Sequence, residues 1–168
     1  MVKKTDAKKN GKQGETVHVS VLIDESGSMS GREEAVALGF NTFLAELRDG
    51  EADASARLSL ALFDLNANEP VTRVRIDNVP LPEVTGITAA DYRPRGMTPL
   101  NDAVAKTVRR LDKRVAENDR AIVVVMTDGL ENCSRTTSTK LRKLIIAKEK
   151  AGWEFIYLGA NQDSWAES

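Results

Sequence analysis

The sequence predicts an α/β domain built on a doubly wound, mostly parallel sheet, with one antiparallel edge strand and helices on both faces. Three observations support this class. Strand-like apolar runs alternate with segments of helical period along the 168 residues. The run AIVVVMTDG, at 121–129, is apolar until its end, as expected of a central parallel strand covered on both faces. Two other runs are separated only by LNANEP, which indicates an antiparallel hairpin.

The first strand is predicted over 17–24, where valine and isoleucine at the odd positions alternate with His18, Ser20 and Leu22. His18 lies inside this strand and is interpreted as a structural residue. A helix is predicted after Gly31, because the apolar residues that follow recur at helical spacing and form one face. These residues are Val36, Phe40, Phe43, Leu44 and Leu47.

The hairpin is predicted from strands over 57–64 and 71–77. Arg73 and Arg75 give the second strand a basic side, which is typical of an exposed edge strand. Asp64 ends the first strand of the hairpin and is interpreted as a turn residue.

Residues 78–97 contain three prolines and show no period, which predicts a long loop of the kind that often carries function. The helix after it is predicted to begin with Thr98 as N-cap and Pro99 at the first helical position. Its predicted buried stripe is Leu100, Val104, Val108, Leu111 and Val115. A last helix, which carries Leu141, Leu144 and Ile145, and a final strand over 153–159 complete the pattern.

Right-handed crossovers favour the strand order 3-2-1-4-5. The first strand and the strand at 121–129 are then neighbours at the point where the winding reverses, and ligands bind outside the carboxyl ends of strands at such a point. Asp24 and Asp128 end these two strands, so we expect both carboxylates to face one crevice. Two close carboxylates repel each other unless a cation lies between them.

Hydroxyl groups accompany the two carboxylates. Ser26 and Ser28 alternate along the segment after Asp24, and Thr98 stands at the end of the long loop. All are hard oxygen ligands without an accompanying histidine or cysteine, which disfavours zinc and copper. The set favours Mg²⁺, and Mn²⁺ or Ca²⁺ could replace it.

The segments DESGS, GMTPL and MTDG resemble the three loops of the von Willebrand factor type A domain family, in the family's order. The compact bacterial and phage-type stand-alone members are especially similar, in the stretches YRPRGMTPLNDAV and WEFIYLGANQD. The resemblance covers about residues 17–160 and implies a Rossmann-like fold. It also implies a metal-ion-dependent adhesion site with five ligands, which bind directly or through water. They are Asp24, Ser26, Ser28, Thr98 and Asp128.

Family members usually add a helix after the last strand, whereas only ANQDSWAES follows here. We therefore expect one face near the last strand to be under-covered.

The resemblance implies a metal-dependent protein-binding module, not an enzyme. An Asp or Glu of a partner protein would complete the shell of Mg²⁺ at an open position. Five residues are interpreted as the rim that meets the partner, and Glu25 among them is expected to face solvent. The rim comprises Glu25, Arg93, Arg95, Glu131 and Asn132.

A Mg²⁺-dependent phosphatase or phosphotransferase is the alternative, because some phosphohydrolases place a nucleophilic aspartate at the end of their first strand. Such enzymes need a second aspartate two residues later, and Ser26 occupies that position.

Composition indicates one domain over 17–168, preceded by a disordered basic tail at 1–16 that holds five lysines and two acidic residues. The whole chain has a net charge of −1, which gives no nucleic-acid or membrane signal. No apolar run approaches the ~20 residues that span a bilayer. With a single cysteine and no signal-peptide pattern at the N-terminus, the expected location is the cytoplasm.

Overall fold

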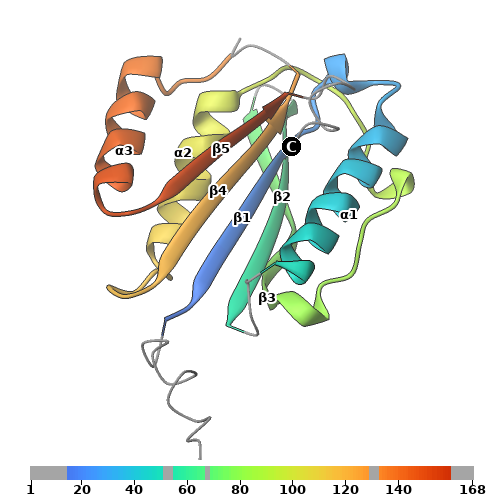
Figure 1. Cartoon of the computed structure of the whole chain (residues 1–168). Helices are drawn as coiled ribbons and strands as arrows, with labels where there is room; N and C mark the ends of the chain where they lie inside the picture. Colours follow the sequence, from blue (N-terminus) through green and yellow to red (C-terminus); the bar gives the residue numbers. More distant parts are fainter. Residues whose placement is uncertain (1–14, 51–54, 67–68, 129–132, 160–168) are drawn as a thin grey trace, which may run out of the picture.

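The computed structural model describes residues 15–50, 55–66, 69–128 and 133–159 (Figure 1). Within these residues, five strands and three α-helices follow one another in the predicted order. The strands are β1 (Val17–Asp24), β2 (Ala56–Asn66), β3 (Glu69–Pro80), β4 (Arg120–Thr127) and β5 (Glu154–Gly159). The helices are α1 (Glu33–Asp49), α2 (Leu100–Asp112) and α3 (Ser138–Lys150).

The sheet has the order β3-β2-β1-β4-β5, which confirms the predicted topology. β1 pairs in parallel with both β2 and β4, β4 pairs in parallel with β5, and only β2 and β3 are antiparallel. In this register Asp24 lies beside Phe63 of β2, and Ile23 lies beside Met126 of β4. The carboxyl ends of the two central strands therefore meet at the same edge of the sheet.

The two faces of the sheet bury separate cores because side chains alternate along each strand. Val21 of β1 packs with Phe40 and Leu44 of α1 on one face. Leu22 packs on the opposite face with Val104 of α2 and with other residues of α2 and α3. Figure 1 shows α1 on one side of the sheet and the pair α2 and α3 on the other, which confirms the prediction of helices on both faces.

Helix α2 begins later than predicted. Pro99 is the N-cap and makes no side-chain capping bond, and the amide of Ala103 donates to the Pro99 carbonyl over 3.0 Å. Thr98 is therefore not the N-cap, because it lies in the preceding loop. The predicted stripe is confirmed at its centre, where Val104, Val108 and Leu111 are buried.

The predicted stripe is only partly buried at its two ends. Leu100 and Val115 are partly buried against the same core, and Val115 lies beyond the end of α2.

The hairpin is longer than predicted. β2 extends to Asn66 and β3 begins at Glu69, so most of LNANEP belongs to the strands. β3 also runs to Pro80, and two 3₁₀ turns, Leu81–Glu83 and Ala89–Asp91, interrupt the predicted loop. β3 is an edge strand, as predicted. Asp64 lies inside β2 and is fully buried, so the interpretation of it as a turn residue is wrong.

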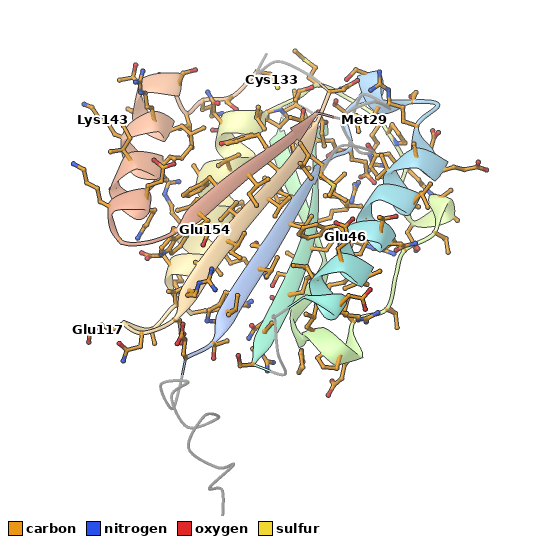
Figure 2. All side chains as sticks on the ribbon, viewed as in Figure 1. Met29, Glu46, Glu117, Cys133, Lys143 and Glu154 are labelled. Atoms are coloured by element: carbon orange, nitrogen blue, oxygen red, sulfur yellow. The ribbon has the colours of Figure 1, made fainter. Side chains whose placement is uncertain are left out.

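Most of the predicted tail and all of ANQDSWAES lie outside the described residues. Within the part of the chain that is described, no helix is long and apolar enough to cross a bilayer. Side chains mark the two ends of the sheet in Figure 2, where Met29 and Cys133 lie near the carboxyl ends of the strands and Glu117 lies at the opposite end.

Candidate functional site

Asp24 lies at the carboxyl end of β1 and is fully buried. Its Oδ1 accepts a hydrogen bond from the amide of Ser26 over 2.8 Å, and its Oδ2 accepts one from the Thr127 hydroxyl over 2.6 Å. Burial raises the pKa of Asp24, the hydrogen bonds from Ser26 and Thr127 act against that rise, and the charge of Asp128 adds to it. A carboxylate that is fully buried and lies near a second carboxylate favours a cation at this edge.

The two serines connect Asp24 to Asp128. The hydroxyl oxygens of Ser26 and Ser28 lie 3.1 Å apart, and the Ser28 hydroxyl donates to Asp128 Oδ1 over 2.9 Å. Four of the five predicted ligands therefore form one hydrogen-bonded chain that crosses from the end of β1 to the end of β4. Met29, in the short 3₁₀ turn Gly27–Met29, is buried in the core under α1 and anchors this loop.

Thr98, the fifth predicted ligand, is 3% exposed and belongs to a loop that runs beside the Asp24 loop. Two main-chain hydrogen bonds join the loops. The amide of Gly27 donates to the Gly96 carbonyl over 2.9 Å, and the amide of Arg95 donates to the Glu25 carbonyl over 2.8 Å. All three segments that the sequence singles out therefore meet at this edge.

Tyr92 supports the main chain of Asp24 and was not predicted from the sequence as a site residue. Its side chain is buried, and its hydroxyl donates to the main-chain carbonyl of Asp24. Burial raises the pKa of Tyr92, and the charges of Asp24 and Asp128 raise it further. The hydroxyl therefore remains a donor at any ordinary pH. Thr127 was missed as well, although its position next to Asp128 in MTDG was a usable signal.

Glu25 does not lie on the rim as predicted. The side chain points away from solvent and the residue is 1% exposed. Its Oε2 accepts the amide of Arg93 over 3.0 Å, and its Oε1 forms an ion pair with Arg73. Arg73 belongs to the edge strand β3 and supplies the positive charge that offsets Glu25, which allows the glutamate to be buried.

The two predicted rim arginines differ in their contacts. Arg95 Nε donates to Asp64 Oδ2 over 2.8 Å, so its charge is matched by a buried carboxylate. Arg93 is exposed, and among the described residues its side chain makes no hydrogen bond or ion pair. Arg32, which was not predicted, lies 3.6 Å from Asp128 Oδ2. Glu131 and Asn132 fall outside the described residues.

The donor chemistry of this edge fits a hard divalent cation. The described residues hold no group of three or more histidine, cysteine, aspartate or glutamate side chains that could bind a metal. The edge instead combines two carboxylates with hydroxyls, a set that suits Mg²⁺ better than zinc or copper.

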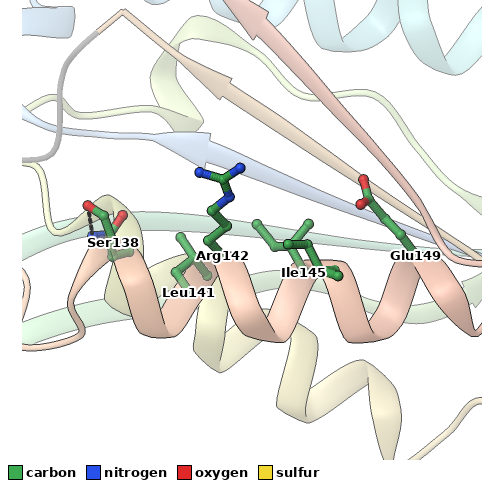
Figure 3. A pocket seen from close by; sticks show the side chains of 7 residues that line it. Ser138, Leu141, Arg142, Ile145 and Glu149 are labelled. Atoms are coloured by element: carbon green, nitrogen blue, oxygen red, sulfur yellow. Dashed lines mark hydrogen bonds between the residues drawn. The ribbon is translucent and has the colours of Figure 1, made fainter.

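A separate pocket lies along α3 (Figure 3). Leu141, Ile145 and Ile146 supply its apolar lining, with Arg142 and Glu149 beside them. None of the predicted site residues lines it.

Comparisons with known proteins agree with this architecture. The family model described as von Willebrand factor type A domain matches residues 18–167. A comparison with curated proteins gives no match.

Two solved structures share the fold at a TM-score of 0.60. The manganese-loaded TRAP protein of Plasmodium vivax is 19% identical over 88% of this chain and 58% of its own. The pilus adhesin SpaC of Lactobacillus rhamnosus GG is 15% identical over 88% of this chain and 25% of its own. The chain thus spans little more than half of the first relative and a quarter of the second.

Proposed function

Because the chain belongs to the von Willebrand factor type A domain family, we propose that it is a metal-dependent protein-binding module. The hydrogen-bonded chain from Asp24 through Ser26 and Ser28 to Asp128 is the observation that carries this proposal. It gathers carboxylate and hydroxyl oxygens at the point where ligands bind to doubly wound sheets.

The proposed ligands of the cation are Asp24, Ser26, Ser28, Thr98 and Asp128. When bound, Mg²⁺ would act as a Lewis acid that attracts an anionic oxygen, and Mn²⁺ or Ca²⁺ could replace it. The manganese in the similar Plasmodium vivax protein supports a divalent cation in this fold. The raised pKa of Asp24 supports it too, because a nearby cation stabilises the charged form of the carboxylate.

The proposed partner is a protein that presents an Asp or Glu to the cation. The protein ligands supply two negative charges and otherwise neutral hydroxyls, so the bound cation would stay electrophilic. Arg93 is exposed beside the site and its charge is not matched by a described carboxylate, so it can approach the acidic partner. Arg95 is a poorer candidate because Asp64 already pairs with it.

A phosphatase or phosphotransferase is not favoured. The second aspartate that such enzymes need two residues after the first is Ser26 here. The similar pilus adhesin also supports a binding role over a catalytic one.

Metal binding is tested first by titrating Mn²⁺ and following its spin resonance signal, which weakens on binding. We expect saturable binding that Mg²⁺ displaces, and a loss of affinity of about tenfold or more in Ser28→Ala because a ligand is removed. Ser30→Ala is the matched control, since Ser30 is an exposed serine of the same loop outside the hydrogen-bonded chain. An unchanged spectrum with the wild-type protein would refute the metal site.

Partner chemistry is tested by selecting peptides from a random display library in Mg²⁺ and eluting them with EDTA. The enriched peptides should share an Asp or Glu, and replacing it with Asn or Gln should abolish binding. Thr98→Ala should also abolish binding, whereas Thr98→Ser keeps the hydroxyl and should retain part of it. Enrichment of peptides that bind equally well in EDTA would contradict this function.

A further inference from the structure

Four charged side chains form a continuous network beside the candidate site. Glu25 contacts Arg73, Arg73 also lies 3.8 Å from Asp64 Oδ2, and Arg95 donates to the same oxygen over 2.8 Å. We propose that this network is a positioning device, which holds the Thr98 loop against the Asp24 loop and thereby sets the affinity of the site for its cation. The inference rests on the proposed metal-binding function.

The four residues come from four different segments. Glu25 lies between two proposed ligands, Asp24 and Ser26, whereas Asp64 lies in β2 and Arg73 in β3. Arg95 precedes Thr98 by three residues in the loop that leads to α2. The network therefore joins both ligand loops to the hairpin, which contributes no proposed ligand.

A main-chain hydrogen bond places this network at the point where the two ligand loops meet. The Arg95 amide donates to the Glu25 carbonyl, so the two ends of the side-chain network are also joined directly through the main chain. The amide of Arg93 donates to Glu25 Oε2. Glu25 thus holds the start of the Thr98 loop while its neighbours on either side face the cation site.

The burial of the network argues against a role in stability alone. The Glu25 and Asp64 side chains are 2% and 0% exposed, whereas Arg73 and Arg95 are 32% and 51% exposed. Asp64 Oδ1 is buried and has no hydrogen-bond partner among the described residues. Buried charges carry a large desolvation cost, and apolar residues of similar volume often give equal or greater stability. A network of this kind is better explained by the geometry that it imposes on the loops.

The inference is tested with Asp64→Asn and Arg95→Ala, measured by Mn²⁺ titration well below their melting temperatures. Residues that orient metal ligands typically change metal affinity 10- to 100-fold, so we expect a dissociation constant raised by about tenfold or more. Amide hydrogen exchange of Gly27 and Arg95 should also accelerate, since these amides join the two loops. Arg95 is half-exposed, so Arg95→Ala tests the inference even if Asp64→Asn does not fold.

Asp119→Asn is the matched control. Asp119 is also a buried carboxylate that joins separate segments, but it lies at the start of β1 and β4, at the opposite end of the sheet. Its loss should lower the melting temperature and leave the Mn²⁺ affinity unchanged. Wild-type affinity in Arg95→Ala would overturn the positioning role while leaving the metal site intact. An absence of Mn²⁺ binding in the wild-type protein would instead overturn the proposed function itself.

Discussion

Gly96 has a conformation that no other residue can adopt without strain. Its φ is +71°, and a Cβ atom placed on it would lie 2.2 Å from the main-chain oxygen of Leu65. The carbonyl of Gly96 accepts the amide of Gly27, which holds the two ligand loops together. The small residue at this position therefore allows the Thr98 loop to approach both β2 and the Asp24 loop.

Gly96→Ala should lower the free energy of unfolding more than Gly31→Ala. Gly31 also has a positive φ, of +85°, but a Cβ there would meet no atom within 4 Å. Gly31→Ala should therefore cost only the strain of the left-handed conformation, about 1–2 kcal/mol. Gly96→Ala adds a clash with main chain that cannot rotate away, so the Leu65 segment must move. Urea unfolding measures both, and equal losses would contradict the close approach at Gly96.

At the scale of elements, Asp119 fastens the starts of β1 and β4 together. Its Oδ1 accepts the amide of Thr16, its Oδ2 accepts the amide of Ala116, and the same oxygen lies 2.9 Å from His18 Nε2. His18 is buried and its ring is used in this contact, in agreement with the structural role predicted for it. Burial acts to raise the pKa of Asp119, but the hydrogen bonds from Ala116, Thr16 and His18 outweigh it and lower the pKa.

The lowered pKa predicts a pH-dependent contribution from Asp119. A carboxyl group with a lower pKa in the folded state stabilises the protein above its unfolded-state pKa and loses that effect as the pH falls through the folded-state value. The wild-type protein should therefore exceed Asp119→Asn in stability by about 1 kcal/mol at pH 6, which is the usual loss for a hydrogen bond. The gap should shrink below about pH 4. Chemical unfolding at several pH values measures it, with the exposed Asp49→Asn as a charge control. A gap that stays constant down to pH 3 would contradict the assignment.

At the scale of the whole molecule, the doubly wound topology creates the site. Reversal of the winding between β1 and β4 places the ends of two neighbouring parallel strands at one edge. Asp24 and Asp128 come from those two ends, more than a hundred residues apart in the chain. Only the folded chain brings the proposed ligands together, so the cation should bind the folded state alone.

Mn²⁺ should therefore stabilise the folded protein. At a concentration of 100 times the dissociation constant, the expected gain is about 2.7 kcal/mol. For a domain of this size that gain should raise the melting temperature by roughly 5–10 °C. Thermal unfolding at increasing Mn²⁺ measures the effect, and a melting temperature that is independent of Mn²⁺ in the wild-type protein would count against the site.

Asp24→Asn separates the effect of this carboxylate on the stability of the metal-free fold from its effect on metal binding. Its folded-state pKa is raised, so near neutral pH the buried charge destabilises the metal-free fold. The asparagine keeps an oxygen for the Ser26 amide and offers a donor to Thr127. The variant should match or exceed the wild-type protein in metal-free stability and should show no response to Mn²⁺.

The sequence by itself determined the architecture and the placement of Asp24 and Asp128 at the ends of neighbouring strands. Residue periods and connection lengths are local properties, and with the handedness of crossovers they led to the strand order and to the meeting of Asp24 with Asp128. Ser26 and Ser28 stand two and four residues after Asp24, so the sequence predicted that they lie on the same side of this loop, whereas the hydrogen bonds that they form appear only in the structure. Their role as metal ligands, with that of Thr98, stays a prediction.

Only the tertiary structure decided the directions and partners of the side chains around the site. Glu25 turns inward because Arg73 approaches from the edge strand, and Asp64 is buried because Arg95 approaches from a loop 31 residues later. Tyr92 reaches the main chain of Asp24 across 68 residues. Periodicity describes which face of its own element a residue occupies. Whether a charged side chain is buried depends on counter-charges from distant segments, and these come together only when the chain has folded.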